Sequence, residues 1–207
     1  MENQDFIDLP MKIKLPGPKV PGWSRIEELI EERRSVRRYT DRELSESVIS
    51  RILRAVQGIS SEDGLRTVPS AGALYPLEIH LVAGEGSGLE SGTYRYVPEE
   101  HTLVQEIAGD LRERLSRAAI SQPMIKNAPV SIVISAVFPR ITSKYGKRGV
   151  RYTHMEAGHA AQNVYLLGVE LGIGTCAVGA FDDEEVRKVL KMPVNEDPLY
   201  ILPLGYM

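Results

Sequence analysis

Arginine is concentrated in one short segment near the start of the chain. Residues 33–39 read RRSVRRY, so several guanidinium groups and one hydroxyl share a stretch the size of a turn. A guanidinium is planar and forms paired, charge-assisted hydrogen bonds to phosphate. The pattern predicts either a site for one small anion or a charged helix end that complements neighbouring glutamates. The candidate residues of the anion site are Arg33, Arg34, Ser35 and Arg37.

Two further segments consist of small residues that let a ligand approach the backbone. The first, residues 69–76, is either a ligand-binding loop or a plain surface loop. The second, residues 172–181, reads GIGTCAVGAF and lacks the G-x-G-x-x-G spacing of a dinucleotide-binding turn. The candidate residues are Pro69, Ser70, Ala71 and Gly72 in the first segment, and Val178, Gly179 and Ala180 in the second.

Metal and thiol chemistry have little support in the sequence. His154 and His159 are five residues apart with Glu156 between them, which is neither H-E-x-x-H nor one helix face. A metal-dependent hydrolase built on these three residues is therefore a disfavoured alternative, and we predict no metal site. Cys176 is the single cysteine, so it forms no disulfide within the chain, and we expect it to be buried.

Composition limits the class of protein. The 207 residues are 43% hydrophobic and 26% charged, which suits one globular domain with a tail. The formal net charge of −3 argues against a nucleic-acid partner. Because no apolar run reaches membrane-spanning length and the first residues are acidic and polar, we expect no membrane partner, no signal peptide and a cytoplasmic location.

Hydrophobic periodicity and turn residues predict an α+β domain over residues 24–207. It follows an extended, proline-rich arm over residues 1–23. Ser24 and Glu27 have capping-box spacing at the start of the first helix. The other predicted helices are 45–57, 109–119 and 153–171. Asp182 caps a last predicted helix, which ends near residue 190. The predicted strands are 77–83, 130–138, 199–206, a short strand and turn at 175–181, and a hairpin of 94–97 and 102–104.

Three other stretches have a distinct character. We expect a long loop over 58–76 and a basic, turn-rich segment over 139–152. The predicted helix 153–171 carries many small residues, which let another helix approach closely. They are Ala157, Gly158, Ala160, Ala161 and Gly168.

Taken in order, these motifs resemble the nitroreductase-like family of FMN-dependent flavoproteins. The motifs are R-x-S-x-R at 33–37, PSAG at 69–72 before a strand, EAGxxxQN at 156–163, LGIG and GAF at 171–181, and LPLGY at 202–206. Together they cover nearly the whole of residues 24–206. Three further motifs are similar to those of the SagB-type branch of this family. They are LPxP at 15–18, AGALYP at 71–76 and KYGxRxxRY at 144–152.

The resemblance implies a fold with a mainly antiparallel central sheet flanked by helices, in an intertwined homodimer with FMN at the interface. It places the FMN phosphate on Arg33, Ser35 and Arg37, with Arg34 nearby. It places Pro69, Ser70, Ala71 and Gly72 along the isoalloxazine and ribityl chain, and the backbone of Val178, Gly179 and Ala180 near flavin N5. Helix 153–171 would lie in the dimer interface. Many relatives continue past the final strand with further phosphate-binding cations, whereas this sequence ends at Met207.

In the SagB-type branch, Lys144 and Tyr145 are the candidate catalytic residues, and a mobile basic loop is the equally weighted alternative. The function implied is an FMN-dependent oxidoreductase. It takes a hydride from NAD(P)H and reduces a small acceptor, such as a nitroaromatic or a quinone, by a ping-pong cycle. The alternatives are a SagB-type oxidase or dehydrogenase acting on a peptide heterocycle, and a flavin-binding protein without turnover of its own.

Overall fold

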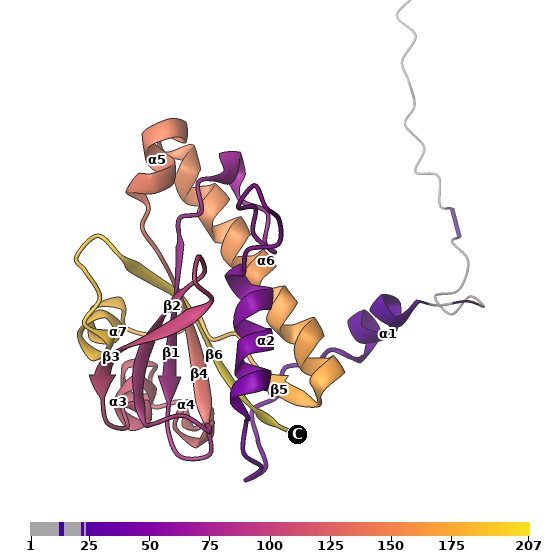
Figure 1. The fold of residues 1–207 in the computed structure, drawn as a ribbon, viewed down its shortest axis with the longest axis vertical. Helices are drawn as coiled ribbons and strands as arrows, with labels where there is room; N and C mark the ends of the chain where they lie inside the picture. Colours follow the sequence, from indigo (N-terminus) through magenta and orange to yellow (C-terminus); the bar gives the residue numbers. More distant parts are fainter. Residues whose placement is uncertain (1–12, 15–21, 23) are drawn as a thin grey trace, which may run out of the picture.

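The computed structural model describes residues 13, 14, 22 and 24–207, and its centre is a six-stranded sheet (Figure 1). The strand order is β3-β2-β1-β4-β6-β5, and every pairing is antiparallel. The strands are β1 (Leu77–Ala83), β2 (Gly92–Val97), β3 (Thr102–Ala108), β4 (Val130–Ala136), β5 (Ile173–Thr175) and β6 (Asp197–Tyr206). The predicted α+β fold with a mainly antiparallel sheet is confirmed.

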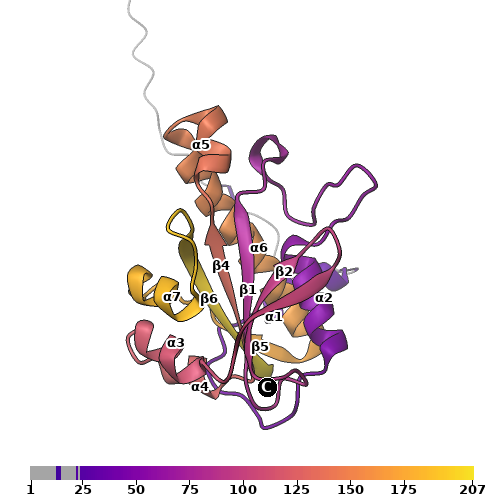
Figure 2. The same cartoon turned by 60° about the vertical axis from the view of Figure 1, so that its left-hand side comes forward.

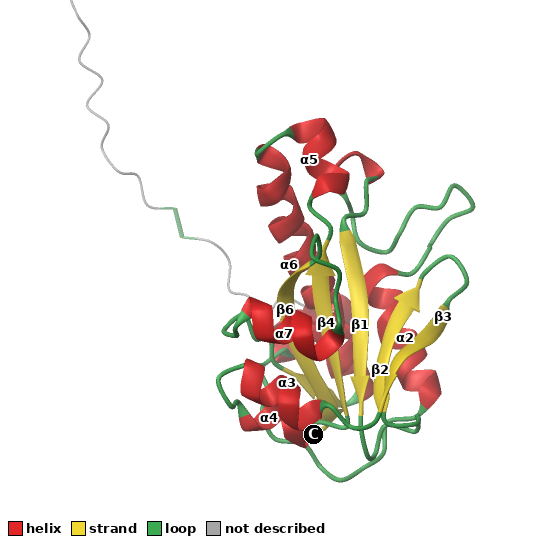
Figure 3. Ribbon diagram, turned by 90° about the vertical axis from the view of Figure 1, so that its left-hand side faces the viewer, coloured by secondary structure: helices red, strands yellow, loops and turns green. Residues whose placement is uncertain are grey.

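Helices cover both faces of the sheet, so the domain has three layers (Figures 2 and 3). One face carries α2 (Glu46–Gln57) and α6 (Arg148–Leu171), and the other carries α3 (Arg112–Ala118), α4 (Pro123–Asn127) and α7 (Asp183–Leu190). The remaining helices are α1 (Arg25–Glu32), η1 (Ala71–Ala73) and α5 (Pro139–Tyr145). In the part of the chain that is described, no helix is both long and apolar enough to cross a bilayer.

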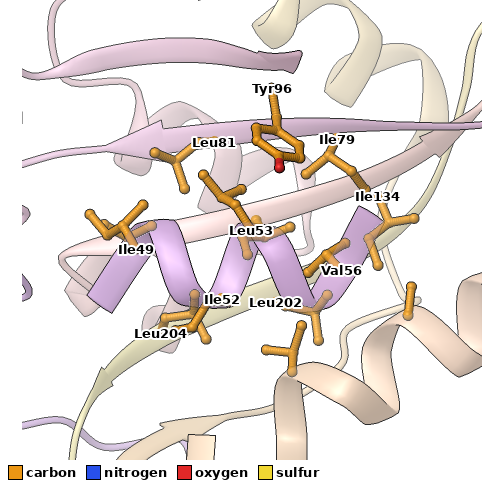
Figure 4. Packing of buried hydrophobic residues seen from close by; sticks show 14 of the residues in the cluster. Ile49, Ile52, Leu53, Val56, Ile79, Leu81, Tyr96, Ile134, Leu202 and Leu204 are labelled. Atoms are coloured by element: carbon orange, nitrogen blue, oxygen red, sulfur yellow. The ribbon is translucent and has the colours of Figure 1, made fainter. Parts of the chain in front are cut away.

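Side-chain alternation along the central strands explains the two faces. Successive side chains of a strand point to opposite sides, so Ile79 and Leu81 join the core under α2 and α6, while Val82 joins the core under α3 and α7. Figure 4 shows Ile49, Ile52, Leu53 and Val56 of α2 packed against the first of these cores.

The helix boundaries follow the capping residues seen in the sequence. The Glu27 carboxylate accepts a hydrogen bond of 2.7 Å from the Ser24 backbone N–H, as the capping box predicts. Asp182 accepts one of 2.9 Å from the backbone N–H of Glu185 at the start of α7. The helix predicted over 45–57 ends at Gln57, before Gly58.

The basic segment 139–152 was wrongly predicted to be turn-rich. It forms α5 and the first turn of α6, which begins at Arg148 rather than near 153. Gly149 makes the close packing of these two helices possible, because a Cβ there would lie 3.1 Å from the backbone of Ile141. The short helix α4 was also missed. The arm predicted over 1–23 lies almost entirely outside the described residues, so that division of the chain stays a prediction.

A charged histidine is buried on the α7 side of β1. His80 is 2% exposed, and its Nε2 lies 2.5 Å from Glu196 Oε1. Its Nδ1 lies 3.5 Å from Glu106 Oε2, and the Ser135 hydroxyl donates to the same oxygen of Glu196. A buried charge is tolerated only when it is paired in this way. The contacts therefore join β1, β3 and β4 to the segment that enters β6.

These contacts make the stability of the fold depend on pH. Burial alone lowers the pKa of His80, but Glu106 and Glu196 outweigh it and raise the pKa to about 9. Contact with His80 lowers the pKa of Glu106. Burial alone would raise the pKa of Glu196, but His80 and Ser135 outweigh this effect and hold that pKa below its ordinary value. The histidine stabilises the fold below its unfolded pKa of about 6.5, and this contribution is lost as the pH rises through about 9. The glutamates stabilise it above about pH 4.5 and lose that effect in acid.

We expect His80→Gln to lower the free energy of unfolding at pH 7 by about 3 kcal/mol, because Glu196 keeps its buried charge without a cationic partner. The decline in stability of the wild type between pH 7 and pH 10 should become shallower in the variant. Urea unfolding at several pH values measures both effects. Glu113→Gln removes an exposed partner of Arg117 and should keep the wild-type slope. An unchanged alkaline slope in His80→Gln would contradict this assignment.

Candidate functional site

The arginine-rich turn is fixed to the edge of the sheet. It follows α1, and the backbone N–H of Val36 donates to the carbonyl of Thr175 in β5 at 2.8 Å. This approach requires glycine at 174, because a Cβ there would lie 2.5 Å from Val36 Cγ1. Arg34, Ser35 and Arg37 are exposed, so their polar groups remain accessible on a backbone that is held in place.

Tyr165 of α6 joins the arginine turn to the glycine-rich segment. Its hydroxyl lies 3.2 Å from Ser35 Oγ and accepts the backbone N–H of Ala177 at 2.8 Å. The Arg33 guanidinium lies 5.3 Å from the centre of the same ring, which is a cation–π distance. The structure therefore brings together two segments that are about 140 residues apart in the sequence. Tyr165 was not among the predicted site residues.

The three residues predicted on the glycine-rich turn differ in exposure. Val178 is buried, and its backbone pairs with Ile201 of β6 in both directions. Gly179 and Ala180 are exposed, and the Ala180 carbonyl accepts a hydrogen bond from Gln122. We call the arginine turn (residues 33–37), Tyr165 and residues 177–180 the anion-side cluster.

A second cluster lies around the loop of Pro69, Ser70, Ala71 and Gly72. Gly72 has a φ of +65°, and a Cβ there would lie 2.8 Å from the Tyr145 hydroxyl and 2.9 Å from Lys144 Nζ. Lys144 and Tyr145 are in the last turn of α5, not in a loop. Both views of the ribbon show η1 beside α5 (Figures 1 and 2). We call residues 69–75 with Lys144 and Tyr145 the turn-side cluster.

The two clusters lie along α6 in one chain. The turn-side cluster extends from Lys144 and Tyr145, just before this helix, to Ser70 beside Glu156, whereas Tyr165 is 17 residues past the first residue of the helix. At 1.5 Å per residue, Tyr165 is about 25 Å along the helix axis from its start and about 14 Å from Glu156. Lys144 and Tyr145 therefore lie at the far end of α6 from the arginine turn within a single chain.

Glu156 of α6 is buried beside the turn-side cluster. It is 2% exposed, its Oε1 accepts a 3.4 Å bond from Gln57, and its Oε2 has no hydrogen-bond partner. Burial raises the pKa of Glu156, and the Ser70 hydroxyl, Gln57 and Arg66 counteract this only in part. His154 and His159 are exposed, so they do not meet Glu156 at one point.

The remaining sequence expectations concern metals and Cys176. Among residues 13, 14, 22 and 24–207, no group of three or more His, Cys, Asp or Glu side chains is arranged to hold a metal ion. Cys176 is buried, as predicted.

Comparison with known proteins identifies the family. The model of the nitroreductase family matches residues 30–206. The Methanocaldococcus jannaschii protein MJ1384, which is named as a nitroreductase, is 44% identical over 195 residues, covering 94% of this chain and 96% of that protein. The microcin B17-processing protein McbC of Escherichia coli is 27% identical over 154 residues, covering 67% of this chain and 52% of that protein.

Solved structures agree with these matches. A nitroreductase structure from Anabaena variabilis has a TM-score of 0.76 and 30% identity, covering 87% of this chain but only 38% of the other. One from Ralstonia eutropha has a TM-score of 0.78 over 93% of this chain and 87% of the other, and at 24% identity it shows the fold alone. The family model spans most of the chain and a 44% identical relative spans nearly all of it, so the chain belongs to the nitroreductase family.

Proposed function

We propose that this chain is an FMN-dependent oxidoreductase that takes a hydride from NAD(P)H and reduces a small acceptor, such as a nitroaromatic or a quinone. Membership of the nitroreductase family supports oxidoreductase chemistry. The observation that carries the FMN assignment is the junction at Tyr165, where cations, a hydroxyl and exposed backbone meet.

The anion-side cluster fits the phosphate end of FMN. Arg33, Arg37 and the Ser35 hydroxyl offer several donors from one turn, and the hydrogen bond of Val36 to β5 fixes the backbone between them. A backbone held in place lowers the ordering cost of binding phosphate through these donors. The exposed backbone at Gly179 and Ala180 suits the edge of a flat ring.

When bound, FMN supplies the hydride-accepting and hydride-donating chemistry, and the protein binds, orients and shields it. We assign the Lys144 ammonium and the Tyr145 hydroxyl to the acceptor, as hydrogen-bond donors beside Gly72. Pro69, Ser70 and Ala71 would border the ring and ribityl chain. Reductant and acceptor would use the same space in turn, which gives a ping-pong cycle.

A second copy of the chain is part of this proposal. The start of α6, next to Lys144 and Tyr145, is about 25 Å from Tyr165 along the helix, and Gly158 lies near the middle of that span. A two-fold axis beside Gly158 would set two α6 helices antiparallel and bring the anion-side cluster of one protomer to the turn-side cluster of the other. Met155 of α6 is 51% exposed and Ile30 of α1 is 55% exposed, so apolar surface is available on that side.

A SagB-type reaction on a peptide heterocycle is the second candidate. Its support is the match to McbC, of which this chain spans about half, and the position of Lys144 and Tyr145 against Gly72. We propose it as an alternative substrate class for the same cofactor site.

The absorbance spectrum of the purified protein mixed with FMN tests the proposed function. We expect a bound-flavin band that bleaches with NADH or NADPH and returns with a quinone or a nitroaromatic. Bleaching only in the presence of a heterocycle-containing peptide would favour the SagB-type alternative. A band that neither reagent bleaches would indicate flavin binding without turnover, and absence of binding would refute the proposal.

Replacing Arg33 and Arg37 together with Ala should abolish retention of FMN, because the phosphate then loses its cationic donors. Titration of the apoprotein, followed by flavin fluorescence, measures the change in Kd, which we expect to exceed 100-fold. Arg38→Ala, in the same turn, is the matched control and should retain binding. If the double variant binds FMN as the wild type does, the arginines are only a charged surface.

Gly158→Leu should disrupt the dimer while each chain stays folded. Nothing lies within 4 Å of a Cβ at Gly158, so the single chain accommodates a side chain that would collide with a second α6. We expect a monomer by analytical ultracentrifugation, an unchanged circular dichroism spectrum and at least tenfold weaker FMN binding. Arg114→Leu, exposed on α3 across the sheet, is the control. A dimeric Gly158→Leu variant with normal binding would rule out this interface.

A further inference from the structure

The turn that follows Gly72 has a backbone that its sequence does not favour. Gly72, Ala73 and Tyr75 have φ values of +65°, +52° and +45°. Left-handed conformations are unstrained for glycine but cost energy for alanine and tyrosine. Two such residues in one short turn persist only where the surroundings hold them.

Tyr75 is the point at which this turn is held. Its backbone N–H donates to Ser70 Oγ at 3.0 Å, and its carbonyl accepts from Arg140 Nη1 at 3.3 Å. Its hydroxyl accepts the backbone N–H of Arg66 at 3.2 Å. The Arg66 guanidinium lies 4.6 Å from the centre of the Tyr75 ring. Backbone, ring and hydroxyl of one residue are therefore all fixed, and Arg66 supplies two of the contacts.

Arg66 is itself anchored from two directions. Its Nη1 donates to Gln57 Oε1 at 3.0 Å and its Nη2 donates to Glu99 Oε1 at 3.1 Å. Gln57 continues this chain of contacts to Glu156 of α6. The Arg66 side chain is only 13% exposed, so the guanidinium is screened from water. Residues of α2 and of the β2–β3 hairpin therefore fix the plane of the guanidinium that lies over the Tyr75 ring.

The other side of the turn meets the candidate catalytic pair. A Cβ at Gly72 would collide with the Tyr145 hydroxyl and Lys144 Nζ, so the turn is packed directly against both groups. Arg140, which holds the Tyr75 carbonyl, lies one helical turn before Lys144 on α5. A shift of the turn would therefore change the surroundings of Lys144 and Tyr145.

We propose that Arg66 is a positioning residue of the turn-side cluster: acting through Tyr75, it holds the turn 72–75, with its left-handed Ala73 and Tyr75, so that Gly72 lies against Lys144 and Tyr145. The effect on catalysis rests on the proposed function, whereas the effect on the turn does not. Arg66 touches neither of the two candidate catalytic side chains.

The interaction depends on the shape of the guanidinium as well as on its charge. The contact with Glu99 involves a carboxylate that is 62% exposed, and such a pair stabilises a protein only weakly. The stack on Tyr75 and the bond to Gln57 need a planar group with donors on two sides, which lysine lacks. Lysine at 66 should therefore fail to replace arginine, although it keeps the positive charge.

The experiment compares Arg66→Met and Arg66→Lys with the wild type by two measurements. The first is amide hydrogen exchange of the segment 67–76 in the protein without added flavin. The second is the rate constant of reoxidation of the reduced flavin by a quinone in the FMN-loaded protein. We expect faster exchange in this segment and a reoxidation rate at least tenfold lower in both variants, because small displacements of catalytic groups slow reactions strongly. Arg51→Met, exposed on α2, is the control and should match the wild type.

A rescue variant separates positioning from general stability. Ala73→Gly removes the cost of a left-handed alanine without touching Arg66 or Tyr75. Added to Arg66→Met, it should slow the exchange of 67–76 again and recover at least threefold of the lost rate. Tyr75→Phe, which deletes only the hydroxyl that accepts the Arg66 N–H, should show the same change in exchange to a smaller extent.

The outcomes distinguish this inference from the proposed function. Wild-type exchange of 67–76 in Arg66→Met overturns the positioning role whether or not FMN binds. Slow flavin reoxidation with unchanged exchange also overturns it, because the effect would then not pass through the turn. Failure of the wild type to bind FMN refutes the proposed function, while the exchange data and the Ala73→Gly rescue still decide the role of Arg66.

Discussion

The length of α6 is the constraint on which the arrangement of the site depends. The helix has 24 residues, and its small buried residues lie on the sheet, so its two ends cannot move toward each other. Tyr165 fixes the anion-side cluster near one end, and α5 and η1 fix the turn-side cluster at the other. One helix therefore separates Lys144 and Tyr145 from the arginine turn. In the proposed function both groups serve one FMN, so a second chain would supply the missing half, and the surface of α6 would matter as much as its ends.

The sequence predicted most of the fold because the central strands and the amphipathic helices carry strong local signals. The alternation of Ile79 and Leu81 with Val82, and the continuous apolar run of β4, are visible without a structure. The failure at 139–152 has a specific cause. Glycine is typical of turns, but Gly149 is where α5 and α6 pack closely, and that role depends on a contact with Ile141, eight residues earlier. The helix α4 has only five residues, too few for periodicity to indicate it.

Prediction of the candidate site from the sequence had the same limit as prediction of the fold. Residues that belong to a local motif, such as Arg33, Ser35 and Gly72, could be proposed as candidates, because a motif needs no knowledge of its partners. Residues that connect motifs were missed. Tyr165 is 130 residues from Ser35, and Arg66 acts on a tyrosine whose left-handed backbone no composition rule predicts. The burial of His80 between two carboxylates likewise depends on Glu196, which is 116 residues away.

Buried carboxylates on the two faces of the sheet differ in their partners. On the α7 side, Glu196 receives both His80 and Ser135, and opposite charges meet at hydrogen-bond distance. On the α6 side, Glu156 has one long bond from Gln57 and an oxygen without a partner, and its pKa is raised by burial. Neither network is fully satisfied, because His80 Nδ1, 3.5 Å from Glu106, also lacks a hydrogen-bond partner. The difference lies in charge: Glu196 meets a histidine at hydrogen-bond distance, whereas Glu156 contacts the neutral Gln57, which in turn binds Arg66. The poorly compensated burial of Glu156 therefore lies two contacts away from Arg66, which we propose holds the strained turn.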